Sequence, residues 1–295
     1  MRWKITKQTS GYLLAAVAGC SWSTLGVLGK LAYSFGADPL TVISLRATIA
    51  TVIVAFFLLI TNPRRFRIKP VDFPFFFVYG FLGVAMNYLG YFYALRFTTV
   101  APAITLLYTY PAMVVVLAFI MYREPITKPK VIALTLTFLG IALSAFGLSS
   151  PKVGLNLPGL LFGLLAALGN AAYTLSGKRA QVSYNPQTSL FYSFLFGALT
   201  LLTFRYAELG AKFVLEPRAF LVIFIIALVP TLLGYGLYTY SLRFIEAGRS
   251  SITSSIEPAI AIYLAFIVLG EVPSSVQIFA SGLIILGVVV LHLRK

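Results

Sequence analysis

Ten long apolar runs, separated by short stretches rich in charge, proline, glycine or asparagine, cover almost the whole chain. Each run holds about 20 residues, which is the length that a helix needs to cross a hydrocarbon core of roughly 30 Å. In lipid the backbone must satisfy its own hydrogen bonds, so each run is expected to form a membrane-spanning helix. The predicted spans are residues 11–33, 39–60, 73–95, 100–121, 130–148, 158–177, 187–206, 219–242, 247–269 and 275–292.

Composition agrees with a polytopic membrane protein of the all-α class. Of 295 residues, 59% are hydrophobic and 11% are charged, whereas soluble domains have roughly 45–50% and about 25%. The net charge of +15 would favour a nucleic-acid partner in a soluble protein, but here the basic residues stand in short clusters between apolar runs. We therefore expect a lipid bilayer around the protein and no nucleic-acid partner. With one cysteine, Cys20, and one histidine, His292, we expect neither a Cys/His metal site nor a cofactor.

The distribution of lysine and arginine predicts the orientation of the chain. With the N-terminus placed in the cytoplasm, 16 of the 23 basic residues fall on the inner side, and Arg46 lies within a span. This asymmetry follows the positive-inside rule, so both termini are expected in the cytoplasm of a cell with the protein in its plasma (inner) membrane. The six basic residues expected on the outer side are Lys30, Arg96, Lys152, Arg205, Lys212 and Arg218.

The two halves of the chain repeat at a constant offset of 147 residues. Residues 93–97, which read YALRF, recur as YSLRF at 240–244, and Glu124 recurs as Glu271. The first spans of the two halves match less closely, at an offset of 148, through Lys30 and Lys178. One shared register over this length predicts two copies of one structural unit.

Each predicted repeat contains five spans, over residues 11–148 and 158–292. Five is an odd number, so the second copy must enter the membrane from the opposite face, and the repeats are expected to be inverted. Inverted repeats are typical of carriers that expose one midplane site to each side in turn. The repeat therefore favours a transporter.

The passage from Val100 to Leu143 and its partner from Arg249 to Leu291 resemble the two copies of the EamA repeat of the drug/metabolite transporter superfamily. They share a mid-helix proline, a glutamate that closes the helix and a glycine-containing helix after it. Arg46 in the second span and Trp22 in the first span fit the same pattern. The resemblance implies a ten-helix inner-membrane carrier, most often an exporter of amino acids or other small metabolites. It also implies a central cavity lined mainly by spans 1, 3, 4, 6, 8 and 9.

Glu257 is the one acidic residue near the centre of a predicted span. A carboxylate at that depth is costly unless it is paired, hydrated or protonated, so it is a candidate for proton coupling or for binding a substrate amine. The alternative is a structural role, in which the carboxyl bonds to backbone groups freed by Pro258 or to Ser254 and Ser255. The repeat partner of Glu257 is Tyr110, so this acid does not belong to the shared scaffold.

Two further features of the spans have a structural and a functional interpretation. Arg46 is the basic residue within a span; it could bind an anionic substrate or extend to the outer headgroups, and the resemblance favours a scaffold role. Pro111 and Pro258 stand at equivalent points of spans 4 and 9. Each proline removes one backbone hydrogen bond and predicts a helix break, which could serve substrate binding, bending between states, or shape alone.

Polar and aromatic residues at helical spacing predict the lining of the cavity. Hydroxyl, amide and ring groups with few fixed charges suit neutral or zwitterionic solutes of modest size, although tyrosine and tryptophan also occur as interfacial belt residues. The candidate cavity residues are Trp22, Asn87, Tyr91, Tyr110, Asn170, Tyr173 and Tyr238.

The predicted function is secondary active transport of amino acids or related small metabolites by alternating access, without catalysis. No glycine-rich phosphate loop for a nucleotide motor is present. A nucleotide-sugar, sugar-phosphate or lipid-linked sugar translocator remains an alternative, although it would need several cations in the cavity. A membrane-embedded enzyme would need a nucleophile with a base or paired acids within the bilayer, and a channel is a further alternative. We expect a small-molecule metabolite as partner and either a monomer or a homodimer.

Overall fold

The computed structural model describes residues 6–98, 100–146, 156–210 and 215–293. Within these ranges the regular structure is helical throughout, with two 3₁₀ turns (η1, η2) and two π-helical segments (η3, η4). The elements are α1 (Lys7–Ser34), α2 (Pro39–Thr61), η1 (Pro63–Phe66), η2 (Pro70–Asp72), α3 (Phe73–Gly80), η3 (Phe81–Met86), α4 (Asn87–Phe97), α5 (Val100–Leu107), α6 (Tyr110–Tyr122), α7 (Lys128–Phe146), α8 (Leu157–Ala180), α9 (Pro186–Leu209), α10 (Pro217–Ile226), η4 (Ala227–Gly234), α11 (Tyr235–Ser241), α12 (Ala247–Ser254), α13 (Glu257–Leu269) and α14 (Ser275–Leu293).

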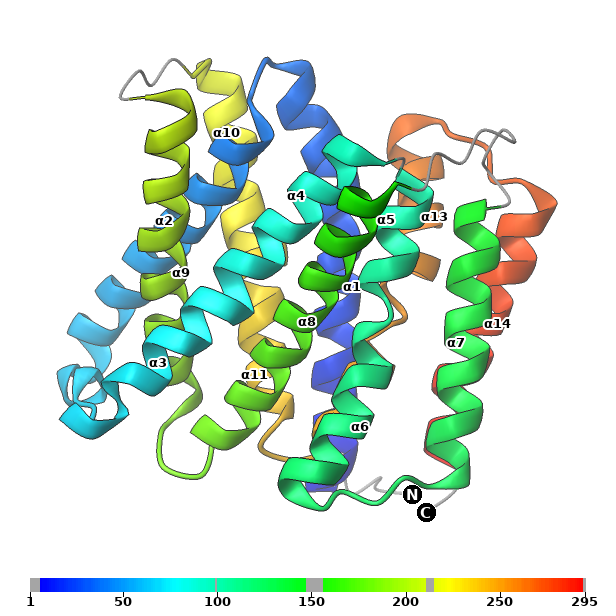
Figure 1. The fold of residues 1–295 in the computed structure, drawn as a ribbon, viewed down its shortest axis with the longest axis horizontal. Helices are drawn as coiled ribbons and strands as arrows, with labels where there is room; N and C mark the ends of the chain where they lie inside the picture. Colours follow the sequence, from blue (N-terminus) through cyan, green and yellow to red (C-terminus); the bar gives the residue numbers. More distant parts are fainter. Residues whose placement is uncertain (1–5, 99, 147–155, 211–214, 294–295) are drawn as a thin grey trace, which may run out of the picture.

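The prediction of ten spans in an all-helical membrane protein is confirmed. Ten helical stretches of the described chain are long and apolar enough to cross a membrane, and they form one bundle (Figure 1). The third and eighth stretches each join two α-helices through a π-helical segment, and the fourth and ninth each consist of two α-helices. Positions 147–148 of the predicted fifth span, and Lys152 and Lys212, lie outside the described residues.

The fourth and ninth spans are interrupted next to the two equivalent prolines. Helix α5 ends at Leu107 and α6 begins at Tyr110, so Pro111 occupies the first turn of α6. Likewise α12 ends at Ser254, and Pro258 lies in the first turn of α13. Proline has no N–H group and is tolerated in a first helical turn, where that group would have no intrahelical partner. Each proline therefore starts a second half-helix within the membrane.

The third and eighth spans contain π-helical segments at equivalent positions. Segment η3 covers Phe81–Met86 and η4 covers Ala227–Gly234, which overlap when one half is shifted by 147 residues. Pro230 lies inside η4 and removes one backbone donor. The first copy has no proline, so the hydrophobic pattern alone does not predict its π-helical turn. Such segments are frequent at functional sites.

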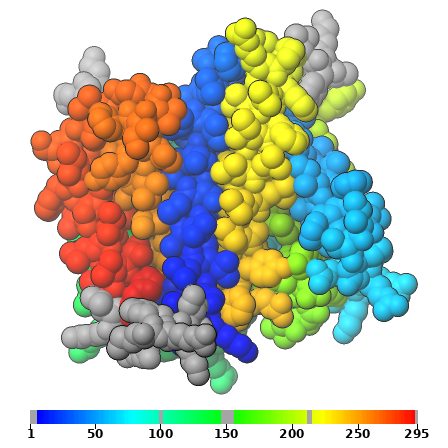
Figure 2. Space-filling model, turned by 180° about the vertical axis from the view of Figure 1, so that it is seen from behind, coloured from blue at the N-terminus to red at the C-terminus, as the bar shows by residue number. Residues whose placement is uncertain are grey.

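Helices of each half of the chain pack against helices of the other half. Helix α1 packs against α10, η4, α11, α12 and α13 of the second half, whereas α8 packs against α3, η3, α4, α5 and α6 of the first half. Helices α2 and α9 form one lateral pair, and α7 and α14 form the other (Figure 1). In Figure 2, α1 runs along the back of the bundle between the last helices of the chain and the segment α10–α11. Helices α1 and α8 therefore each pack mainly against the half of the chain to which they do not belong.

Two glycines allow α1 to approach the second half closely. A β-carbon built on Gly19 would lie 2.5 Å from the carbonyl oxygen of Ser254, and one on Gly234 would lie 2.6 Å from Nε1 of Trp22. Both distances are shorter than real β-carbon contacts, so a larger residue would force the backbones apart. The first contact places α1 directly against the break between α12 and α13.

Equivalent helices end at opposite ends of the bundle. Following the predicted orientation, we call the end at which α1 begins and α14 ends the inner end, and the opposite end the outer end. Helix α6 ends at the inner end, whereas its equivalent α13 ends at the outer end (Figure 1). Large apolar side chains face away from the bundle, as a lipid surround requires; examples are Phe56, Ile60, Ile120, Ile267 and Phe279.

Candidate functional site

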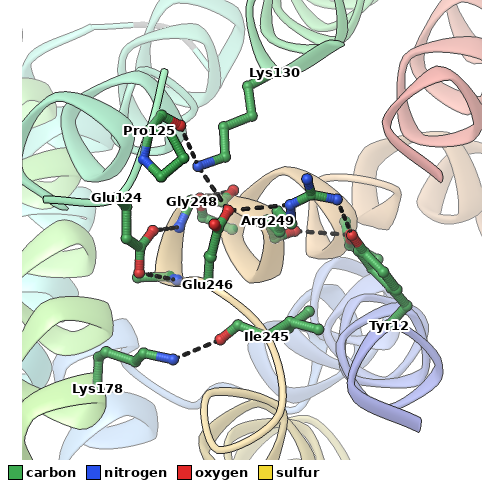
Figure 3. Close-up of polar contacts among 12 residues, drawn as sticks. Tyr12, Glu124, Pro125, Lys130, Lys178, Ile245, Glu246, Gly248 and Arg249 are labelled. Carbon is green, nitrogen blue, oxygen red and sulfur yellow. Dashed lines mark hydrogen bonds and ion pairs between the residues drawn. The ribbon is translucent and has the colours of Figure 1, made fainter. Parts of the chain in front are cut away.

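A network of charged residues joins helices at the inner end, and it begins at the end of α6. Arg123 adopts a left-handed conformation, with φ of 56°, and Pro125 follows, so the helix cannot continue. This turn directs the carboxylate of Glu124 toward α12. The backbone N–H groups of Ala247 and Gly248 donate to its two oxygens, at 2.8 and 3.2 Å. Glu124 is only 8% exposed and caps the first turn of α12 (Figure 3).

A second acid joins α7, α12 and α1 in the same network. Glu246 lies just before α12, and Nζ of Lys130 and Nε of Arg249 approach its Oε2 at 2.8 and 3.0 Å. Lys130 is 1% exposed and also donates to the carbonyl oxygen of Pro125, at 2.8 Å. Arg249 in turn donates to the hydroxyl of Tyr12 on α1 (Figure 3). Glu246 therefore links α7 to α12, and Arg249 extends this link to α1.

The electrostatic environment keeps Glu246 ionised. Burial alone would raise the pKa of Glu246, but the hydrogen bond and charge of Lys130 outweigh it, together with Arg249, and the pKa is lowered from the ordinary value of 4.5. The charged form is therefore the form that this network stabilises.

Lys178 connects α8 to the segment between α11 and α12, just before Glu246. Its Nζ donates to the carbonyl oxygens of Leu242 and Ile245, at 2.8 and 2.7 Å. These carbonyls follow the end of α11, where a cation is favourable because the last carbonyl groups of a helix have no intrahelical partner. The inner end thus joins α1, α6, α7, α8 and α12 through ion pairs and capped helix ends (Figure 3).

The outer end carries the equivalent residues in a different arrangement. Gly270 ends α13 with a φ of 71°, and Glu271 follows, as Glu124 follows Arg123. Glu271 pairs with Lys30 at 2.5 Å, and the two side chains are 51% and 60% exposed. Glu124 is therefore buried on a helix end at the inner end, whereas its counterpart Glu271 forms a solvent-accessible ion pair at the outer end.

Between the two ends, Glu257 begins α13 directly after the break in the ninth span. The side chain is half-buried. Tyr108, from the break in the fourth span, lies within hydrogen-bonding reach of its carboxylate, and Arg46 is near enough to interact with it electrostatically. Tyr91 of α4 is also close to this charge. The two helix breaks thus meet around one acid.

Buried polar groups without a hydrogen-bond partner lie on the same side chains that surround this region. The guanidinium of Arg46 stands 3.7 Å from the centre of the Tyr88 ring, and Arg46 is 5% exposed. Nε of Arg46, the hydroxyl of Tyr88 and Nε1 of Trp22 have no partner among the described residues. Tyr235 connects them, because its ring is 6.2 Å from that of Tyr88 and 5.0 Å from that of Trp22. Unsatisfied buried donors require an explanation, and a bound polar ligand is one.

The EamA-like transporter family matches the chain twice, over residues 9–146 and 157–293. The chain belongs to this family. An uncharacterized transporter of Archaeoglobus fulgidus is 27% identical over 262 residues, which cover 88% of this chain and 90% of the relative. The uncharacterized transporter YetK of Bacillus subtilis is 26% identical over 299 residues, which cover 99% and 89%. A solved crystal structure that is 18% identical covers 96% of both chains with a TM-score of 0.83, which shows the fold alone.

Family membership makes the chain a multi-pass membrane transporter, as predicted, and the names of these relatives give no substrate. Among the described residues, no group of histidine, cysteine and acidic side chains could hold a metal ion.

In this EamA-like protein several of the predicted cavity residues serve helix packing. Asn87 donates to the carbonyl oxygen of Ala166 at 2.8 Å, and the hydroxyl of Tyr110 lies 3.0 Å from Oγ of Ser254. The hydroxyl groups of Tyr173 and Tyr238 are likewise satisfied, by Thr239 at 3.0 Å and Thr174 at 2.9 Å. All four side chains are buried.

The remaining predicted residues keep polar groups that packing does not satisfy or cover. Tyr91, Asn170 and Glu257 are half-buried, and buried Trp22 has its unpartnered Nε1. Arg46 does not extend to the outer headgroups, because its guanidinium is buried against Tyr88. The half-buried side chains, Nε1 of Trp22 and the hydroxyl of Tyr88 define the candidate solute site, and Arg46 packs beside it on Tyr88.

Sequence reasoning missed Tyr88, Tyr235 and Tyr108. Tyr88 and Tyr235 are separated by the repeat offset of 147, and their rings contact each other, so this equivalence could have been found in the sequence. Tyr108 has no such signal, because its position next to Glu257 depends on how the two helix breaks meet. The inner network of Lys130, Glu246 and Arg249 was also unforeseen.

Proposed function

We propose that this chain is a secondary transporter that exports amino acids or related small zwitterionic metabolites by alternating access. The observation that carries the proposal is the unequal bonding of Glu124 and Glu271, which occupy equivalent positions at the two ends. A buried helix cap holds one end closed, whereas the equivalent acid at the other end remains half exposed. This is the pattern of a carrier closed at its inner end.

Inverted repeats give the two states a simple relation, in which each half adopts the conformation of the other. In the second state Glu271 would cap the first turn of α5, as Glu124 now caps α12. Lys30 would bond to the carbonyl groups at the end of α4, as Lys178 now bonds to those at the end of α11. The inner contacts of Glu124 and Lys178 would be lost at the same time.

The groups around the helix breaks support a solute that carries a positive group. Glu257 offers the carboxylate, either to a substrate amine or to a proton that is exchanged during the cycle. Aromatic rings beside it favour a cation and an apolar side chain of modest size. Arg46 is assigned to the scaffold, because its guanidinium is buried on Tyr88. We place the protein in the plasma (inner) membrane, with both termini in the cytoplasm, as a monomer or homodimer.

The test is uptake and counterflow in proteoliposomes with a panel of labelled amino acids, with and without an imposed pH gradient. Wild type is compared with Glu257→Gln and with a control, Glu216→Gln, which removes an exposed acid at the outer end. We expect neutral amino acids to exchange in wild type and in the control. We expect the response to the pH gradient, or substrate binding itself, to be lost in Glu257→Gln.

Three results separate the parts of the proposal. If Glu257→Gln transports like wild type under both conditions, Glu257 has a structural role. If no amino acid is exchanged by wild type, the substrate class is wrong, and sugars and phosphorylated metabolites should be assayed next. A pH response that is lost while counterflow remains would assign proton coupling, rather than amine binding, to Glu257.

A further inference from the structure

A polar pocket lies at the inner end, separate from the network of Glu124, Lys130, Glu246 and Arg249. It has a volume of about 580 Å³ and is formed by the connection between α2 and α3 and by the turn between α8 and α9. Four basic residues of the first connection line it, and the second turn adds Tyr184 and the residues that follow it. The basic residues are Arg64, Arg65, Arg67 and Lys69.

Hydrogen bonds between the two connections fix the shape of this pocket. The hydroxyl of Thr188 donates to the carbonyl oxygen of Arg65 at 2.8 Å. The hydroxyl of Tyr192 donates to the carbonyl oxygen of Phe66 at 2.6 Å. The backbone N–H of Lys69 donates to the hydroxyl of Tyr184 at 3.1 Å. The basic segment is therefore held against the start of α9, and its side chains share one wall.

In the part of the chain that the structure describes, the positive charge of the pocket exceeds the negative charge beside it. None of its four basic residues forms an ion pair with another described residue. The nearby Asp72 accepts a hydrogen bond from Tyr184. The amino end of α9 adds to the positive potential, because Asn185 makes no side-chain cap there. Four cations and a helix amino end favour a phosphate, which arginine binds through paired N–H groups.

Lipid-facing surface adjoins the pocket. On α2, Phe56 and Ile60 are exposed shortly before the basic segment, and on α3, Phe73 and Phe77 are exposed shortly after it. Helix α2 and its connection to α3 lie at a lateral edge of the bundle, and α9 packs against both helices (Figure 1). A soluble phosphate compound needs no such surface, whereas a phospholipid places its phosphate and its acyl chains on adjacent polar and apolar surfaces.

We infer that this pocket binds the phosphate of an anionic phospholipid, with the acyl chains lying along the exposed faces of α2 and α3. The site differs in place and in ligand from the proposed transport site, and it does not depend on the proposed transport function. A positive-inside cluster that serves orientation alone would attract anionic lipid weakly from any loop. A built pocket would instead hold one headgroup at one place.

Native mass spectrometry of the full-length protein in neutral detergent tests this. The probes are phosphatidylglycerol, phosphatidylcholine with the same acyl chains, and glycerol phosphate. The pocket variant is Arg64→Gln/Arg65→Gln/Arg67→Gln. The matched control removes three basic residues of the inner end outside the pocket: Arg123→Gln/Lys128→Gln/Arg243→Gln. We expect wild type to prefer phosphatidylglycerol and the pocket variant to bind it on the order of 100-fold more weakly, at about five-fold for each basic residue. The control should bind it like wild type.

Three outcomes would overturn the inference. Equal binding of the two lipids by wild type would remove the need for an anionic headgroup. An equal loss in the control would show a general charge effect. Glycerol phosphate that binds as tightly as phosphatidylglycerol would make the pocket a site for a soluble phosphate compound. If the triple variant unfolds, the single variant Arg67→Gln is measured instead, because it changes one exposed side chain. We expect it to bind phosphatidylglycerol about five-fold more weakly than the control Lys128→Gln.

Discussion

At the inner end Glu124 follows α6, and at the outer end Glu271 follows α13, 147 positions later. The turns that present the two acids are alike, since a residue with positive φ precedes each of them. Their partners differ: Glu124 is buried on two backbone N–H groups, and Glu271 is in an exposed pair with Lys30. Residues at equivalent sequence positions therefore contribute unequally to the stability of this structure. The difference teaches that the local turn does not decide which partners these acids contact.

The largest expected effect is that of Glu124→Ala. It leaves two buried N–H groups of α12 without an acceptor, which costs about 2–3 kcal/mol and shifts the equilibrium toward an open inner end roughly 30- to 150-fold. Labelling by a water-soluble maleimide measures this, with a cysteine at buried Ser251 in a Cys20→Ser background. The matched variant Glu271→Ala should change the labelling little. Equal acceleration by both variants would contradict the difference between the ends.

Lys130→Met should have the next largest effect. It removes a buried cation from Glu246, which is itself about one-third exposed, so we expect a loss on the order of 1–2 kcal/mol rather than the full value for a buried pair. The thermal unfolding midpoint and the Ser251→Cys labelling rate report it. The control is Lys128→Met, because Lys128 is exposed and two residues away. Unchanged labelling would show that the ion pair does not hold the inner end closed.

The pH dependence should be smaller and should have a defined sign. Because the folded-state pKa of Glu246 is lowered from 4.5, its contribution to stability is complete above that ordinary value and is lost as the pH falls through the lowered pKa. We therefore expect the inner end to open more readily in acid below about pH 4.5. Glu246→Gln should be less stable at neutral pH and should lack this part of the dependence. A wild-type profile that stays flat from pH 6 to pH 3 would contradict the assignment.

The smallest effect is expected at the outer end. Lys30→Gln removes an exposed ion pair, which contributes about 0–1 kcal/mol and is screened by salt. We expect a change in unfolding midpoint that is small at low ionic strength and disappears at high ionic strength. A large, salt-independent loss would mean that the pair is as important for this state as the buried contacts of Glu124. The equivalent variant Lys178→Gln, which loses two backbone acceptors, is the reference for comparison.

The sequence predicts the spans well and the site only partly, for physical reasons. Lipid imposes one length and one hydrogen-bonding solution on each span, so the ninth predicted span, 247–269, coincides with the observed Ala247–Leu269. Residues such as Tyr173 and Tyr238 have a helical spacing that fits a cavity lining and a packing interface equally well. Their hydroxyl partners, Thr239 and Thr174, come from other spans. Periodicity gives the face of a residue, but the helix opposite that face is decided by tertiary packing.

The exchange of packing partners between α1 and α8 has a consequence for biogenesis. Helix α1 leaves the ribosome well before the helices that it packs against, α10 to α13, which begin only at Pro217. At about 5–20 residues per second, the chain needs on the order of ten seconds or more to supply them. During that time α1 must wait in the lipid with its small-residue face, including Gly19, uncovered. The insertion machinery therefore holds a helix that cannot complete its packing until α10 to α13 have been made.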